Sequence, residues 1–294
     1  MHRTETFRQF FPRIEVIGLF MIWSLAFVFL FMAKPISIYA NDSEAGLFGG
    51  QLILKKSDNI VMESENLFVS LDEVRVSYVF RNVGSKDVVT MVAFPMPEIC
   101  LDVSDGEVDT PVSFDLSSKD PLSFRIEVDG KSVQAKLDVK SKLNKDGSEK
   151  CVTYTYYWDQ IFVAKKVLAV NHHYVPSTDS FMIPSDVFSK KGTQIQDPEW
   201  KNLVKDHCIE DSFTRSLQKN AKDAWAKRLR YVLKTALNWK GSIGTFKLTI
   251  RKPTPKSLVS LCWKGLKKID KTTFEFNAKS FVPNSDLDIL FINI

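Results

Sequence analysis

The chain has 294 residues, with 40 lysines and arginines against 35 aspartates and glutamates, a net charge of +5. The first 40 residues hold four of the basic and two of the acidic side chains, so the remainder has 36 against 33 and a net charge of +3. This balance argues against a dedicated nucleic-acid-binding protein, and the remaining roughly 250 residues are enough for a sizeable core in one or two domains.

Residues 1–40 have the order of a secretory signal peptide. Three arginines precede an uncharged apolar run from 16 to 33, and a short polar stretch then ends in the small residue Ala40. We predict export with cleavage after Ala40, or after Ala45 as a second site. Because the run approaches the roughly 20 residues that span a bilayer, an uncleaved anchor is the alternative. In both cases the positive-inside rule places the rest of the chain outside the cytoplasm.

Period-two alternation dominates residues 41–195, which we expect to form a β-sandwich-like region. In residues 74–80, apolar and polar side chains alternate as in a half-buried strand. The pattern predicts three hairpins, which are 74–80 with 88–94 through a turn at 84–87, 122–140 around Asp129-Gly130, and 152–174 with a bend at 164–166. The polar residues 141–150 are expected to form an exposed loop.

Residues 196–225 lack alternation and are rich in helix-forming residues. With Pro198 at a favourable first position, one or two short helices are expected from Glu199 to Lys222. A carboxyl-terminal β region, 226–294, is expected to pack with the first, with strands at 229–239, 245–251, 257–263, 273–278 and 287–292. The sequence therefore predicts a mainly β protein, an antiparallel β-sandwich of one or two packed units with a short helical insert.

The four cysteines, Cys100, Cys151, Cys208 and Cys262, all lie beyond the predicted signal peptide. None has the C-x-x-C spacing of a redox motif or a zinc site, and disulfides persist outside the cytoplasm. Structural bridges are therefore expected. The spacing alone leaves three complete pairings open.

Several short strings in the chain resemble one exported bacterial family. In the first half they are Asn41-Asp42-Ser43, the run from Val92 to Pro97, Trp158-x-Gln160-x-Phe162 and His173-Tyr174-x-Pro176. In the second half they are the run from His207 to Asp211, Asn238-Trp239, Leu258-Val259-Ser260-x-Cys262 and the run from Leu287 to Leu290. Together they resemble the domain-of-unknown-function family 4424 over nearly the whole exported part.

That family brings no assigned activity, so the resemblance implies no catalytic residue. It does bear on the cysteines, because Cys208 and Cys262 each lie within one of the matching strings. The resemblance therefore favours a bridge between these two, with Cys100 to Cys151 as the secondary expectation.

Two groups of titratable residues are candidates for chemistry. His172 and His173 are neighbours on a predicted strand, so we expect one buried and one exposed side chain rather than a shared metal ion. His207, Glu210 and Asp211 have helical spacing, which would place an imidazole and two carboxylates on one helix face. A surface cluster beside a disulfide is the alternative reading of these three. Phosphate-loop, dinucleotide, serine-elbow and zinc-protease motifs are missing from the sequence.

Basic residues gather in the carboxyl half, where residues 201–240 hold ten basic against four acidic side chains. We expect any ligand there to be anionic and its binding to weaken with salt; an ordinary solvated surface is the alternative. The side chains that would hold it are Lys222, Lys227, Arg228 and Arg230. Three tryptophans lie among these charges as core residues, rim residues or platforms for sugar, namely Trp225, Trp239 and Trp263.

The first functional hypothesis is an exported, non-catalytic envelope protein, periplasmic or secreted, that binds or assembles with a partner through its β-sandwich surface. The expected partner is an envelope protein or an anionic lipid or polysaccharide, without nucleic acid or cofactor, and with membrane contact only through the N-terminal segment. The alternative is an envelope hydrolase or metal-dependent enzyme that uses His207, Glu210 and Asp211.

Overall fold

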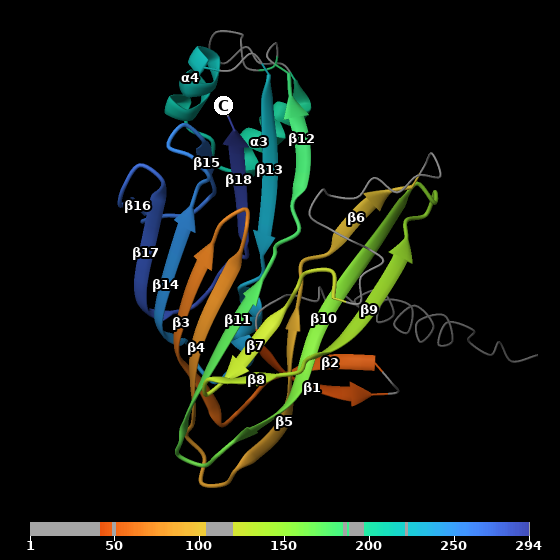
Figure 1. Ribbon diagram of the computed structural model, residues 1–294, viewed down its shortest axis with the longest axis vertical. Helices are drawn as coiled ribbons and strands as arrows, with labels where there is room; N and C mark the ends of the chain where they lie inside the picture. The colour runs from red at the N-terminus through yellow and green to blue at the C-terminus, as the bar shows by residue number, and fades with distance from the viewer. Residues whose placement is uncertain are drawn as a thin grey trace, which may run out of the picture. The chain divides into compact units, whose positions relative to one another are not determined.

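Three β-sheets dominate the computed structural model, which describes residues 42–48, 51–103, 120–184, 187, 197–220 and 223–293 (Figure 1). Sheet A has the strand order β2-β1-β5-β10-β6, with β9 also paired to β10. Sheet B has the order β16-β17-β14-β3-β4-β11-β7-β8, and sheet C the order β12-β13-β18-β15. The predicted mainly β, sandwich-type fold is confirmed. Residues 1–40, the predicted signal peptide, lie outside the described residues.

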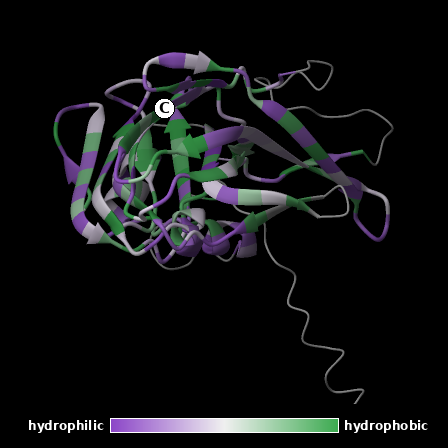
Figure 2. Cartoon of the chain, turned by 90° about the horizontal axis from the view of Figure 1, so that it is seen from below, coloured by the Kyte–Doolittle hydropathy of each residue, from purple (hydrophilic) through white to green (hydrophobic). Residues whose placement is uncertain are grey.

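Sheet A owes its two faces to alternating side chains. Its strands are β1 (Ser43–Phe48), β2 (Gln51–Lys55), β5 (Val88–Pro95), β6 (Ile99–Asp102), β9 (Lys136–Leu143) and β10 (Glu149–Phe162). In β10 the even-numbered side chains from Tyr154 to Phe162 are buried, whereas Asp159 and Ile161 face solvent. Figure 2 shows the same alternation of hydrophobic and hydrophilic residues along the strands.

Sheet B contains a parallel pair in an otherwise antiparallel arrangement. Its strands are β3 (Ile60–Val69), β4 (Val74–Asn82), β7 (Arg125–Val128), β8 (Lys131–Val133), β11 (Val167–Tyr174), β14 (Ile243–Arg251), β16 (Lys267–Lys268) and β17 (Thr273–Phe281). Strands β3 and β14 run parallel, with Ser64 opposite Thr245 and Val69 opposite Ile250. Strands β3 and β14 are therefore neighbours in the sheet although most of the described residues lie between them in the sequence.

Sheet C is covered on one face by two helices. Its strands are β12 (Asp179–Ile183), β13 (Ala224–Tyr231), β15 (Leu258–Ser260) and β18 (Leu287–Asn293), and the helical elements are α3 (Pro198–Asp206), α4 (Asp211–Asn220) and the 3₁₀ helix η2 (Lys234–Asn238). Helix α3 begins as predicted, with Pro198 in its first turn and the Asp197 carboxylate accepting the backbone N–H of Trp200 at 2.9 Å. No helix in the described residues combines the length and hydrophobicity of a bilayer span.

All three sheets contribute to one main hydrophobic core. Phe94 and Trp158 of sheet A, Tyr78 of sheet B and Leu229 of sheet C belong to it. A second cluster lies between sheet C and the helices and contains Trp200, Leu217, Ala226 and Ile292. Strand β13 thus buries residues on both faces, which explains why its alternation was difficult to recognise in the sequence. The division into regions 41–195, 196–225 and 226–294 stays a prediction.

Two of the three predicted hairpins are wrong in their pairing. Strand β4 pairs with β3 and β11, whereas β5 pairs with β1 and β10, so the turn at 84–87 carries the chain from sheet B to sheet A. The bend at 164–166 likewise carries it from β10 in sheet A to β11 in sheet B. The hairpin at Asp129-Gly130 is confirmed, because β7 pairs with β8 across two positive-φ residues.

Two further boundaries differ from the prediction. The expected loop 141–150 is shorter than predicted, since β9 reaches Leu143 and β10 begins at Glu149, which leaves residues 144–148 as the connection. The expected strand 229–239 begins earlier, at Ala224, and ends at Tyr231, after which η2 forms. In β9 the side chains from Ser141 to Leu143 are all exposed, so the sequence carries no apolar alternation there that would reveal the strand.

Candidate functional site

The outer face of sheet B carries two rows of polar side chains that cross three strands. Within each row the residues are direct neighbours in the strand register. The members of the rows, from β3 through β14 to β17, are Ser64, Thr245 and Lys279, then Asn66, Lys247 and Asn277. Hydroxyl, amide and ammonium groups therefore stand side by side on an exposed surface.

Alternation along each strand explains why these groups face outward. In β14, Phe246 and Leu248 are buried in the main core, which turns Thr245 and Lys247 to the other face. In β3, Glu65 is buried in the same way between Ser64 and Asn66. The polar rows are thus fixed by the packing beneath them.

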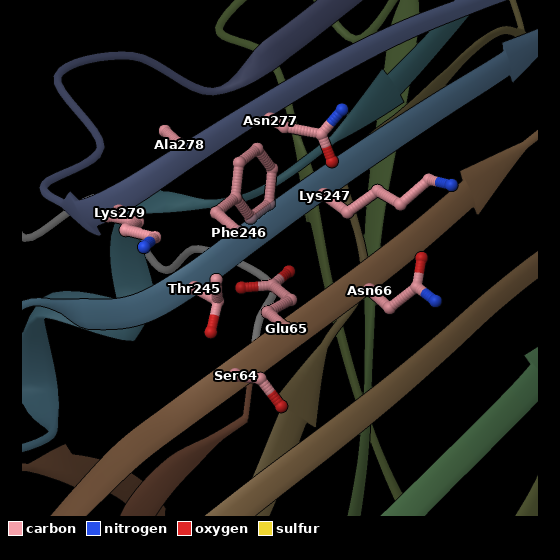
Figure 3. Close-up of a pocket in the computed structure, with 9 residues that line it drawn as sticks. All are labelled: Ser64, Glu65, Asn66, Thr245, Phe246, Lys247, Asn277, Ala278 and Lys279. Carbon is pink, nitrogen blue, oxygen red and sulfur yellow. The ribbon is translucent and has the colours of Figure 1, made fainter.

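An open groove of about 530 Å³ lies over these strands (Figure 3). This volume is within the range of about 300–1,000 Å³ that is usual for small-molecule sites. The groove is lined by Ser64, Glu65, Asn66, Thr245, Phe246, Lys247, Asn277, Ala278 and Lys279. We call it the sheet B groove.

Strands β3 and β14 approach each other closely at Gly244, directly before the sheet B groove. A Cβ atom at Gly244 would lie 2.5 Å from the carbonyl oxygen of Glu63. The register of β3 shifts between Met62 and Ser64, and Ser280 of β17 has a φ of 48°. Such irregularities re-aim side chains and occur often beside binding sites.

The two lysines of the sheet B groove differ in their partners. Lys247 forms an ion pair with Glu275 of the neighbouring strand, at 2.9 Å between Nζ and Oε1. Lys279 is exposed and has no carboxylate within ion-pair distance in the described part of the chain. The groove therefore offers one uncompensated positive charge beside two amides and two hydroxyls.

Charged side chains on the next part of the outer face are paired with one another. The guanidinium groups of Arg75 and Arg251 stack on the Phe68 ring at 4.3 and 4.9 Å. Glu73 lies 3.5 Å from Arg75, 3.8 Å from Arg251 and 3.1 Å from His173. The single carboxylate of Glu73 balances only one of the two guanidinium charges, so these side chains are paired with one another but keep a net positive charge.

The predicted cluster of His207, Glu210 and Asp211 is not assembled. Helix α3 ends at Asp206, His207 is its C-cap, and α4 begins only at Asp211, so the three do not share a helix face. Glu210 and Asp211 are exposed, whereas His207 is 1% exposed. The chain reverses between the helices at Cys208, whose φ is 50°. The helical spacing was misleading because no single helix spans these residues.

His207 belongs instead to a hydrogen-bonded group in which it is buried and its partners Asp288 and Arg228 are half-buried. Its Nδ1 lies 3.2 Å from the Leu203 carbonyl and its Nε2 lies 3.1 Å from Asp288, which also pairs with Arg228 through two guanidinium nitrogens. Burial alone would raise the pKa of Asp288, but hydrogen bonds from Arg228 and His207 outweigh burial and hold that pKa well below its usual range. The group is saturated by its own members, as in a structural ion network.

The predicted anion-binding residues are also partly satisfied within the fold. Arg228 pairs with Asp288, while Arg230 donates to the Glu98 carbonyl at 2.9 Å and to Asp179 at 3.3 Å. Lys227 is half-buried on the opposite side of β13, and Lys222 lies outside the described residues. The two arginines do share one strand face, but carboxylates already occupy it.

The neighbouring histidines behave as expected. His172 is buried and lies 3.6 Å from Asp42, whereas His173 is exposed and pairs with Glu73. Among the three tryptophans, Trp239 is buried in the main core and Trp263 packs partly buried against Phe276. Trp225 is 60% exposed, so of the three it is the one placed to stack on a ligand.

Two disulfides are present, Cys208–Cys262 and Cys100–Cys151, and both predicted pairings are confirmed. Disulfides of this kind indicate folding in an oxidising compartment. In the described residues, the group with metal-like spacing is Glu98, Cys100 and Cys151, but its two sulfur atoms are bonded to each other. A bonded disulfide has no thiolate to offer a metal.

The sheet B groove was not predicted from the sequence. Alternation at 245–251 and 273–278 was visible, and it places Thr245, Lys247 and Asn277 on one face. The parallel pairing of β3 with β14 has no local signal, because the two strands are separated by most of the chain.

Comparisons with known proteins agree with this fold. A sequence model of the family described as "Domain of unknown function (DUF4424)" matches residues 40–151 and 149–290. A crystal structure from Legionella pneumophila, described as a "putative nutrient binding protein", superposes with a TM-score of 0.51 at 16% identity, over 86% of this chain and 70% of that chain. At that identity the likeness shows the fold alone. No curated protein matches the chain.

Proposed function

The chain belongs to the DUF4424 family, which carries no assigned activity, and from this premise we propose that it is an exported, non-catalytic binding module of the cell envelope. The observation that carries the proposal is the pair of polar rows in the sheet B groove. The Legionella structure, described as a putative nutrient binding protein, fits a binding role.

The proposed location is the periplasm or the exterior. Two disulfides favour an oxidising compartment, and the basic, then apolar, then small-residue order of residues 1–40 favours export. Contact with the membrane would be limited to this N-terminal segment.

The proposed ligand is an anionic polysaccharide of the envelope. Asparagine amides, each with two donors and an acceptor, and neighbouring hydroxyls match the hydroxyl groups of a sugar chain. Lys279 supplies an uncompensated charge for a carboxylate or sulfate on that chain. The strand register spaces these groups in rows, which suits a repetitive, extended ligand better than a compact one.

Retention on immobilised anionic polysaccharide tests this proposal. The protein purified from the envelope should be retained at about 0.1 M salt and released near 1 M, because the Debye length falls from about 10 to 3 Å. Lys279→Glu should abolish retention, whereas Lys264→Glu, an exposed lysine outside the groove, should leave it unchanged.

The alternative surfaces have their own outcomes in the same assay. Loss of retention with Arg230→Glu but not with Lys279→Glu would move the site to β13. Retention on anionic lipid vesicles alone would replace polysaccharide with lipid. Retention that is unchanged both by salt and by Lys279→Glu contradicts the proposal that the sheet B groove binds an anionic polysaccharide.

A further inference from the structure

Two arginines on the outer face of sheet B share one aromatic ring. The guanidinium carbons of Arg75 and Arg251 lie 4.3 and 4.9 Å from the centre of the Phe68 ring. Arg75 of β4 is directly opposite Phe68 of β3, and Arg251 is the last residue of β14, the strand on the other side of β3. Three neighbouring strands therefore bring two cationic groups to one ring, and cation–π contacts hold them there.

These guanidinium groups have more hydrogen-bond donors than the fold uses. Each has five N–H groups. Oε1 of Glu73 lies 3.5 Å from Nε of Arg75 and 3.8 Å from Nη2 of Arg251, while Oε2 contacts His173 at 3.1 Å. Neither arginine donates a hydrogen bond of normal length to the described residues. Because the two side chains are 53% and 50% exposed, their remaining donors are open to solvent.

The arginine pair is on the same face of the sheet as the sheet B groove. In β3 the side chains of Ser64 and Phe68 share one face, with buried residues between them. Strand β14 advances by roughly 20 Å from Thr245 to Arg251, since each residue adds about 3.4 Å. Lys279 is directly opposite Thr245. Positive charge that the fold does not balance therefore occurs at two places, roughly 20 Å apart along the strands.

Uncharged or balanced polar groups lie between these two places. Asn66 and Asn277 are on either side of Lys247 in one row, and the charge of Lys247 is balanced by Glu275. Thr249 of β14 follows in the next row, opposite Phe68. A chain that lies along the strands would meet a charge, then hydrogen-bonding groups, then a charge again.

We propose that Arg75 and Arg251 form a second anion subsite for a carboxylate or sulfate further along the polysaccharide that occupies the sheet B groove. The inference rests on the proposed function and extends it. A guanidinium can hold a carboxylate through two parallel hydrogen bonds, and the Phe68 ring orients both groups before the ligand arrives. A single sugar is too short to reach both subsites, so the ligand is an oligosaccharide of several residues that spans roughly 20 Å.

Glu73 competes with the ligand for this subsite. Its carboxylate already lies between the two arginines and would repel a second anion at close range. Glu73→Gln should therefore strengthen the binding of a long anionic oligosaccharide. If the arginines and Glu73 were only a structural ion cluster, the same substitution would not strengthen binding.

Fragments of polygalacturonate of graded length test the subsite, with dissociation constants measured by calorimetry on the protein purified from the envelope. We expect fragments that span about 20 Å to bind about tenfold more tightly than fragments half as long, because a linked second contact adds to the first. Arg75→Gln together with Arg251→Gln should remove this gain and leave the affinity for short fragments unchanged. Glu73→Gln should tighten the binding of long fragments about threefold.

Arg215→Gln together with Lys264→Gln is the matched control, because it also removes two exposed positive charges, one on α4 and one outside the groove, and it should keep the full gain. If no fragment binds in a manner that depends on Lys279, the proposed function fails and the subsite fails with it. If such binding is present but the gain with length survives the double arginine substitution, only the subsite is overturned. Unchanged or weaker binding to Glu73→Gln overturns the subsite even where the double variant does not fold.

Discussion

His172 and His173 are neighbours on β11, but only His172 is buried. Burial of His172 makes the free energy of unfolding depend on pH. The rings of Phe94, Phe124 and Trp158 lie 4.8, 5.1 and 5.5 Å from the ring of His172. Among these rings the charged form of His172 is disfavoured, and burial lowers its pKa from 6.5 to about 3. His173 is exposed on the other face.

The first prediction compares His172→Phe with His173→Phe. Between about pH 6.5 and 3 the unfolded chain binds a proton at residue 172 that the folded chain does not, so stability is lost as the pH falls through this range. His172→Phe should remove this loss, on the order of a few kcal/mol, and His173→Phe should keep it. Urea unfolding at several pH values measures both. Equal acid sensitivity of the two variants would contradict the prediction.

Residue-level placement was predictable where it depends only on alternation. The opposite faces of His172 and His173 follow from period two. The contact between His172 and Asp42 does not, because it joins β11 to the start of β1 across the core. The same limit applies to His207, whose partner Asp288 is 81 positions away.

Strands were easier to predict than their partners. Alternation identified β4, β5, β10 and β11 as strands, but short turns suggested local hairpins where the chain instead crosses between sheets. The side chain of Asn82 explains one crossing, because its amide donates to the carbonyls of Lys86 and Phe162 and so fixes the exit from β4. Such long-range bonds leave no periodic trace in the sequence.

The contact between β3 and β14 leads to the second prediction, which compares Gly244→Ala with Gly46→Ala. At Gly244 an added methyl group would meet the backbone of Glu63 at 2.5 Å, and the backbone must move. At Gly46 it would meet only the flexible end of Lys55. Gly244→Ala should therefore lower the free energy of unfolding by roughly 1–3 kcal/mol, and Gly46→Ala by much less.

Urea unfolding midpoints at constant slope measure this difference. The Gly244→Ala protein should also lose affinity for the ligand of the sheet B groove, since Thr245 would shift with the backbone. Equal stability losses at the two glycines would contradict the prediction, because they would mean that β3 and β14 can move apart around the added methyl group without a cost in the free energy of unfolding.

At the scale of the whole molecule, two disulfides close loops of similar length. Cys100–Cys151 spans 51 positions and joins β6 to β10, whereas Cys208–Cys262 spans 54 and ties the turn between α3 and α4 to the segment after β15. Because chain entropy depends on loop length, each should stabilise the fold by roughly 4 kcal/mol.

The third prediction is that removing either bridge, as Cys100→Ala with Cys151→Ala or as Cys208→Ala with Cys262→Ala, costs about the same, roughly 4 kcal/mol. Denaturant unfolding of the two double variants measures the loss. A much larger loss for one pair would show that contacts in the native state, rather than the entropy of the unfolded chain, determine its contribution.

Under the proposed export, the order in which the chain emerges matters, because Trp239 bonds to Asp42, 197 positions earlier in the sequence. Under that proposal, Trp239 cannot hold the start of β1, nor can β14 pair with β3, until the chain has crossed the membrane as far as β14. Until then β3 keeps an open edge of unpaired N–H and C=O groups, which is a template for association with other chains. Folding is therefore expected to end late, and in the proposed periplasmic location chaperones that shield strand edges should raise the yield of this protein more than that of a protein with local pairings.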